Sequence, residues 1–286
     1  MTLVIARRVQ VRKKDKTYNR VSLSSDSRIN LETKGLKNDN CVKVFSIPVK
    51  ISEPAENNKE KIVYNNSLGL AVAGGFISAY TIKESISEIL KKLQYVPNAM
   101  ELSMEKIAEF VLKFFRKISF DFRALGDDNR LCMLILSGFC PKEKKVRIFE
   151  FSIDKSIHTE ERYYHKEILK NDGIVFFGSG AKVAKEIYQS DSNLNEFQII
   201  KKIIVEEKDD TVGGGIQYGD ICCNRTNFEV FGVQDYSLND DGTFKEYLHT
   251  LRGLTFYKDK FESDVNDFHI SPTFKTPFTE EINKLL

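Results

Sequence analysis

The chain has 286 residues, which is enough for one large domain or two small ones. Its 41% hydrophobic and 29% charged residues are typical of a soluble globular protein. The net charge of +2, with both signs interspersed, argues against a nucleic-acid partner. No apolar run approaches the ~18–20 residues needed to span a membrane, so no membrane partner is expected.

The cysteines and histidines favour a reduced, metal-free protein. None of the five cysteines belongs to a C-x-x-C pair, and no secretion signal accompanies them. The four histidines are scattered, without the spacing of a zinc hydrolase. We therefore expect a cytoplasmic protein with no metal and no cofactor.

The chain begins with Met1-Thr2, followed by the short apolar block Leu3-Val4-Ile5, which predicts a buried strand. If Met1 is removed, Thr2 carries a hydroxyl and a free α-amine on one residue. Such an amine has a pKa near ~8, so it can act as general base for its own hydroxyl. The alternative is that Thr2 is merely the second residue of an edge strand.

Two further strands follow. The second strand, from Val21, ends in Asp26-Ser27-Arg28, and the third covers residues 41–47. In the third strand, Lys43 shares a face with three apolar residues. A lysine there lies either at the sheet edge, with its stem over the core, or desolvated against a carboxylate. Residues 52–66 are polar and predict a surface insertion.

The next strand, residues 68–73, runs into Gly74-Gly75. A helix follows, because apolar residues recur with helical spacing between Ile82 and Leu93. The two glycines can expose backbone N–H groups, as an oxyanion hole requires, or simply make a tight turn. The pattern of a phosphate-binding P-loop is absent.

The residue pattern in the middle of the chain predicts further helices and strands. A helix over 103–118 is apolar on more than one face, so a sheet and a second helix or subunit should cover it. A hairpin follows over 131–151, and residues 158–170 are expected to be irregular. The chain then has a strand ending in Gly178-Ser179-Gly180 and helices over 181–189 and 194–205, as well as a loop over 209–215 and a strand over 228–233.

Strands and pairs of helices thus alternate in blocks along the chain. This order predicts an α+β fold in which two antiparallel sheets lie face to face with helices outside, a four-layer αββα sandwich. We expect residues 1–233 to form this domain. Residues 234–286, which are aromatic-rich but aperiodic, should form a C-terminal extension over the domain or a neighbouring subunit.

With these motifs in this order, the chain resembles the N-terminal-nucleophile (Ntn) hydrolases, and among them the bacterial proteasome-like peptidases related to proteasome β-subunits. The resemblance covers about residues 2–233. It rests on the Thr after the first Met, the Asp-Ser-Arg that closes the second strand and the lysine of the third strand. Ala-Gly-Gly before the first helix, Gly-Ser-Gly before the third, and Asp-x-x-x-Gly-Gly before a late strand complete it.

The resemblance implies a set of catalytic roles. Thr2 would be the nucleophile and its own amine the general base. Lys43 would lower the pKa of the Thr2 group through its positive charge, and Asp26 would orient Lys43. The backbone N–H of Gly74 would stabilise the oxyanion.

By the same resemblance, Ser179 and Asp209 would position the α-amine, and an extended substrate would bind as an added strand. The residues implied to bind substrate are Ile29, Asn30, Cys41, Phe45, Val72 and Phe76. Most of these side chains are apolar, which predicts a preference for apolar substrate side chains. One departure concerns Val212, which stands where the family usually has a serine, unless Thr211 replaces the hydroxyl.

The resemblance implies a threonine-type peptidase, assembled as a homo-oligomeric ring or ring-like particle, which cleaves peptides or unfolded proteins. An ATP-dependent unfoldase is a possible partner. Two alternatives stay open: an Ntn amidase acting on a small acyl substrate, and a catalytically inactive ring-forming subunit that retains Met1.

Overall fold

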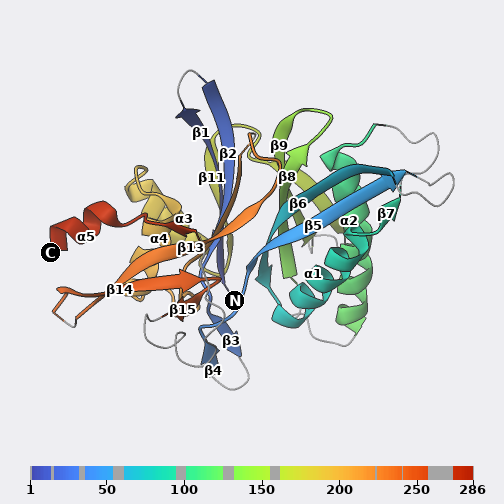
Figure 1. Cartoon of the computed structure of the whole chain (residues 1–286). Helices are drawn as coiled ribbons and strands as arrows, with labels where there is room; N and C mark the ends of the chain where they lie inside the picture. Colours follow the sequence, from blue (N-terminus) through green and yellow to red (C-terminus); the bar gives the residue numbers. More distant parts are fainter. Residues whose placement is uncertain are drawn as a thin grey trace, which may run out of the picture.

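Two β-sheets, with helices packed on each, form most of the computed structural model (Figure 1). The structure describes residues 2–13, 16–31, 36–53, 61–94, 101–124, 132–154, 162–222, 224–239, 241–256 and 273–285. The predicted mixture of helices and strands is confirmed. In the part of the chain so described, no helix is both long and apolar enough to cross a membrane.

The first sheet has the strand order β11-β1-β2-β12-β13-β14-β15, and β16 pairs with β13. Its strands are β1 (Leu3–Lys13), β2 (Lys16–Ser25), β11 (Gly173–Gly178), β12 (Gln217–Cys222), β13 (Glu229–Leu238), β14 (Phe244–Leu251), β15 (Leu254–Phe256) and β16 (Phe274–Lys275). All these pairs are antiparallel except β13–β16. The helices α3 (Ala181–Ser190) and α4 (Glu196–Val205) pack on this sheet.

The second sheet has the order β10-β9-β8-β6-β5-β7. Its strands are β5 (Val44–Glu53), β6 (Lys61–Gly74), β7 (Leu93–Gln94), β8 (Cys132–Cys140), β9 (Lys145–Asp154) and β10 (Arg162–Ile168). The helices α1 (Phe76–Leu90) and α2 (Met104–Ala124) pack on it and on each other, on the right of Figure 1. A separate two-stranded ribbon joins β3 (Ile29–Leu31) and β4 (Leu36–Asn38).

Strand β1 is buried on both of its faces. Leu3 and Ile5 belong to the core under α3 and α4, whereas Val4 and Ala6 belong to the core between the two sheets. This arrangement explains why the first strand begins with an unbroken apolar block rather than an alternating one, since successive side chains point to opposite faces. It also fixes the start of the chain inside the molecule.

Several element boundaries differ from the predictions. Residues 162–168, expected to be irregular, form β10, which pairs along its length with β9 and places His165 against Phe151. The prediction was wrong because a polar strand at a sheet edge depends on its partner rather than on a pattern of its own. Strands β5 and β6 likewise extend into both ends of the predicted insertion, whose centre (54–60) lies outside the described residues.

The C-terminal segment contributes regular structure to the first sheet. Strand β13 runs through residue 233 to Leu238, and β14 to β16 follow it. The last helix, α5 (Thr279–Leu285), begins beside Phe278, which is 1% exposed and packs against Phe197 and Tyr236. An aromatic side chain buried in this way ties the end of the chain to the core under α4.

We predict that Phe278→Ala lowers the free energy of unfolding by about 3–5 kcal/mol, because it removes a buried ring and leaves a cavity. Urea unfolding at a fixed protein concentration measures the effect. Val205→Ala, which changes a side chain that is 50% exposed at the end of α4, is the control and should stay within about 0.5 kcal/mol of the parent. Equal stability of the two variants would show that the C-terminal segment is not anchored through Phe278.

Candidate active site

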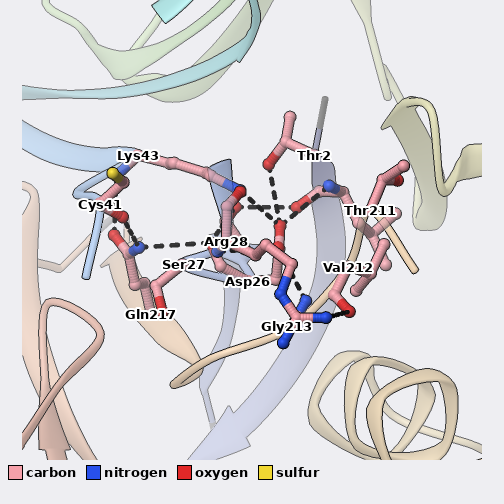
Figure 2. Close-up of polar contacts among 12 residues, drawn as sticks. Thr2, Asp26, Ser27, Arg28, Cys41, Lys43, Thr211, Val212, Gly213 and Gln217 are labelled. Carbon is pink, nitrogen blue, oxygen red and sulfur yellow. Dashed lines mark hydrogen bonds and ion pairs between the residues drawn. The ribbon is translucent and has the colours of Figure 1, made fainter. Parts of the chain in front are cut away.

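The carboxylate of Asp26, at the end of β2, is fully buried and is the centre of a hydrogen-bond network (Figure 2). Its Oδ1 accepts hydrogen bonds from Thr2 Oγ1 (2.8 Å), from the Leu3 backbone N–H (2.9 Å) and from Lys43 Nζ (2.8 Å). The threonine hydroxyl and the lysine ammonium therefore meet at one oxygen atom. A buried carboxylate is stable only with such donors, because burial without them costs several kcal/mol.

The second oxygen of Asp26 is bound by backbone groups. Oδ2 accepts from the N–H of Arg28 and from the N–H of Gly213, both at 3.1 Å. The Gly213 nitrogen comes from the loop before β12, so this carboxylate joins three distant parts of the chain. A Cβ on Gly213 would lie 2.2 Å from Cζ of Arg28, which explains the need for glycine at this position.

Lys43, which was predicted to lie inside the third strand, lies just before β5, since that strand spans Val44–Glu53, and it is buried. Its Nζ donates to Asp26 and also to the carbonyl oxygen of Arg28 (2.6 Å). Of the two placements considered for this lysine, the structure has the one in which it is desolvated against a carboxylate. Burial lowers the pKa of Lys43, and the attraction of Asp26 opposes that shift.

A second chain of polar groups leads away from the Thr2 nitrogen. This nitrogen donates to Ser179 Oγ (3.1 Å), Ser179 Oγ lies 2.7 Å from Thr211 Oγ1, and Thr211 Oγ1 donates to Asp209 Oδ1 (2.6 Å). Because Thr211 gives its only hydroxyl proton to the carboxylate, it must accept from Ser179, which in turn accepts from Thr2. All the donors therefore point from Thr2 towards Asp209.

Thr211, and not Val212, contributes a hydroxyl group to this series of contacts. Val212 is instead buried with the apolar core under α3 and α4. Asp209 consequently acts on Thr2 through two hydroxyl groups rather than by direct contact. Gly178, at the other side of Thr2, has a φ of +91°, and a Cβ there would lie 2.1 Å from the Thr2 carbonyl oxygen.

In the described part of the chain, Gly74 is connected to the segment of Lys43 only through its neighbours in β6. It ends β6 with a φ of +95°, two residues beyond Val72, whose N–H donates to the carbonyl oxygen of Lys43 (3.0 Å). Within the described ranges, no hydrogen bond joins Gly74 to Thr2, Asp26 or Lys43. Its role as an oxyanion donor stays a prediction.

Gln217, at the start of β12, is a site residue that the sequence analysis missed. Its Oε1 accepts from the N–H groups of Lys43 (2.8 Å) and Val44 (3.2 Å), and its Nε2 donates to the carbonyl oxygens of Cys41 (2.6 Å) and Asp26 (3.2 Å). This fully buried side chain thus holds the segment with the lysine against the end of β2. The signal in the sequence was a glutamine between Ile216 and Tyr218, a polar residue where an apolar strand begins.

Arg28 is a second missed residue, and it supports the loop before β12. Its guanidinium binds both oxygens of Asp39 (2.6 and 3.0 Å) and donates to the carbonyl oxygens of Asp210 (3.3 Å) and Val212 (3.4 Å). Hydrogen bonding to Asp39 raises the pKa of Arg28, and the same bonds lower the pKa of Asp39. The pair stays charged and holds Gly213 against Asp26.

The residues predicted to bind substrate lie in two groups. Cys41, Phe45 and Val72 are buried, and Phe76, at the start of α1, is 38% exposed. Tyr80, which was not predicted, connects them, because its ring centroid lies 5.6 Å from that of Phe45 and 4.3 Å from that of Phe76. The second group, Ile29 and Asn30, is half-buried in β3.

No arrangement of three or more His, Cys, Asp or Glu side chains in the described ranges could hold a metal ion. The polar centre instead combines one carboxylate, one lysine and a threonine at the second position of the chain. Such a set of groups can perform nucleophilic and proton-transfer chemistry.

Comparison with known proteins shows the fold alone. No protein-family model and no curated protein sequence matches the chain. The Anbu complex of Pseudomonas aeruginosa, solved as a helical assembly, is similar in structure with a TM-score of 0.53 and 11% identity, over 81% of this chain and 86% of that protein. An Anbu (Gly-1) mutant from Hyphomicrobium sp. strain MC1 has a TM-score of 0.50 and 15% identity, over 80% and 87%.

A further similar structure, Anbu (ancestral beta-subunit) from Yersinia bercovieri, has a TM-score of 0.48 and 14% identity over 80% of this chain and 86% of that protein. The first two similarities establish that the chain has an Anbu-like fold.

We predict that Gln217→Leu lowers the free energy of unfolding by at least about 2 kcal/mol, because it leaves buried backbone N–H and C=O groups without partners. Urea unfolding measures the loss. Gln94→Leu, at an exposed position in β7, is the matched control and should change stability by no more than about 0.5 kcal/mol. An unfolding curve of Gln217→Leu that overlays the parent curve would contradict the bridging role.

Proposed function

We propose that the chain is a threonine-type peptidase of the Ntn-hydrolase class, with the four-layer αββα architecture of that class. The observation that carries the proposal is the meeting of Thr2 Oγ1 and Lys43 Nζ at Asp26 Oδ1, with the Thr2 nitrogen bound to Ser179. An amine and a hydroxyl on one residue, beside a buried lysine, match the requirements of an activated terminal nucleophile.

The reaction begins once Met1 has been removed. The α-amine of Thr2 accepts the proton of Oγ1, which attacks the substrate carbonyl carbon and forms a tetrahedral intermediate. The backbone N–H of Gly74 stabilises its oxyanion. The α-ammonium then protonates the leaving amine, the carbon–nitrogen bond breaks, and an ester on Thr2 remains for water to hydrolyse.

The surrounding residues tune this chemistry. The positive charge of Lys43 favours the unprotonated amine and the developing alkoxide, and Asp26 keeps Lys43 oriented. Ser179 and Thr211, with Asp209 behind them, hold the amine in the direction of the hydroxyl. The substrate lies extended between β3 and the residues that follow Gly74, so Ile29 and Asn30 contact it on one side and Phe76 on the other.

The assembly proposed is a homo-oligomer. An Anbu complex with this fold forms a helical assembly, and α1 and α2 expose large apolar side chains, among them Ile77 at 58% and Phe120 at 62%. We place the protein in the cytoplasm, because the described cysteines are free. Peptides or unfolded proteins are the proposed substrates, and an ATP-dependent unfoldase is the proposed source of the latter.

One observation favours the inactive ring-forming subunit as a second candidate. Thr2 is only 2% exposed in the intact chain, so a protein that keeps Met1 presents no accessible nucleophile. The amidase alternative differs only in substrate, and a comparison of peptides with small amides separates it from the peptidase.

We expect the mass of the purified chain to correspond to loss of Met1, and an electrophilic peptide to form one covalent adduct at Thr2. Peptide mass spectrometry locates the adduct. Thr2→Ala should abolish it, whereas Thr2→Ser, which keeps a hydroxyl, is the matched control and should retain it. A chain that keeps Met1 and forms no adduct would refute the peptidase and favour the inactive subunit.

We also expect Thr211→Val to lower kcat/KM by roughly 10–100-fold, because an isosteric methyl group interrupts the hydroxyl chain between Ser179 and Asp209. Steady-state hydrolysis of a fluorogenic peptide measures the loss. Thr211→Ser keeps the hydroxyl and should stay within about threefold of the parent. If Thr211→Val were as active as Thr211→Ser, the relay would have no part in catalysis.

A further inference from the structure

The turn between β14 and β15 places an arginine in a conformation that arginine disfavours. Leu251 pairs with Leu254, so the loop consists of Arg252 and Gly253, with φ values of +54° and +83°. A two-residue hairpin loop with both φ values positive favours Asn-Gly, and a bulky residue there is strained. Turn geometry therefore does not explain why this position has an arginine, and the explanation must lie in the contacts of its side chain.

The backbone of this turn lies directly against the candidate active site. A Cβ on Gly253 would lie 2.4 Å from Cβ of Ser27 and 3.1 Å from Nε2 of Gln217, the residue that positions Lys43. The adjacent Thr250 Oγ1 donates to the carbonyl oxygen of Ile216 (3.1 Å). Figure 1 shows β14 running towards the N-terminus. The contacts leave the turn little freedom to move.

The Arg252 side chain reaches Phe45, one of the residues predicted to bind substrate. Its Cζ lies 5.7 Å from the ring centroid of Phe45, and Lys83 Nζ lies 5.2 Å from the same centroid. Phe45 is two residues after Lys43, and Tyr80 packs against its edge. Burial raises the pKa of Tyr80, and the positive charge of Arg252 opposes that shift. Two cations therefore lie beside Phe45, which belongs to a set of predicted substrate-binding residues that is mostly apolar.

The charges around Phe45 do not cancel. Lys83 pairs with Glu84 at 2.6 Å, which neutralises one cation. Arg252 is exposed and has no hydrogen bond or ion pair with any residue in the described ranges. The guanidinium group presents several N–H donors in a plane that matches a carboxylate. One anionic group would match the unpaired charge of Arg252.

We propose that Arg252 selects substrates with an aspartate or glutamate side chain at the residue that supplies the scissile carbonyl. The carboxylate of that side chain would enter beside Phe45 and bind the guanidinium of Arg252. This inference rests on the proposed function, and it replaces the apolar preference that the sequence predicted. It also assigns the C-terminal extension a role in specificity.

The test uses Arg252→Asn, because asparagine removes the cation while suiting the left-handed turn better than arginine. Matched fluorogenic peptides with Glu or Gln before the scissile bond give the ratio of kcat/KM values. The same peptides without the leaving group give the ratio of Kd values in a Thr2→Ala background, where no turnover is needed. Arg225→Asn, in the connection at the far end of β12, is the control.

We expect the parent and Arg225→Asn to favour Glu over Gln by about tenfold, and Arg252→Asn to lose that ratio without loss of stability. Arg252→Glu should favour a peptide with Arg at the same position. If the parent cleaved and bound the Glu and Gln peptides equally well, with the same kcat/KM and the same Kd for both, the inference would be overturned even though peptides are cleaved. If the protein bound the Glu peptide more tightly than the Gln peptide only when Arg252 was present, but showed neither turnover nor a covalent adduct, the role of Arg252 would be supported and the proposed peptidase activity would be refuted.

Discussion

The buried carboxylate of Asp26 is the constraint on which the rest of the site depends. A charge with no exposure to water must be matched by donors, and here the donors come from the start of β1, the residue before β5, the end of β2 and the loop before β12. A buried charge that has lost some of its donors is more costly than an apolar group at the same place. Each of these four segments therefore helps to keep the others in position. The same network thus fixes the positions of Thr2 and Lys43 and contributes to local stability.

The order of strands explains how the segments meet. Strands β1 and β2 are neighbours in the first sheet, with β11, the edge strand, beside β1 and β12 beside β2. The antiparallel register then brings Gly178, at the end of β11, beside Leu3, and Gln217, at the start of β12, beside Ser25. The loop after β11 and the loop before β12, which are about 30 residues apart along the chain, therefore lie on either side of the start of β1 and the end of β2.

The C-terminal segment adds to this site rather than lying apart from it. Strands β14 and β15 extend the first sheet, and their turn packs on Ser27 and Gln217. One of the two cations beside Phe45 consequently comes from a residue more than 200 positions away in the sequence. A substitution in this hairpin would change the packing around Ser27 and Gln217 as well as the charge beside Phe45.

The sequence by itself determined the elements whose pattern is local: the unbroken apolar start of β1, the helical periodicity of α1 to α4 and the glycine motifs at strand ends. The resemblance to Ntn hydrolases also singled out Asp26, Lys43 and Ser179, which the structure brings together around Thr2. Only the tertiary structure decided that β10 is a strand, that Thr211 links Ser179 to Asp209, that Gln217 bridges two segments and that Arg252 reaches Phe45. Each of these depends on partners far away in the chain, and contacts of that kind leave no periodic trace in the residues that make them.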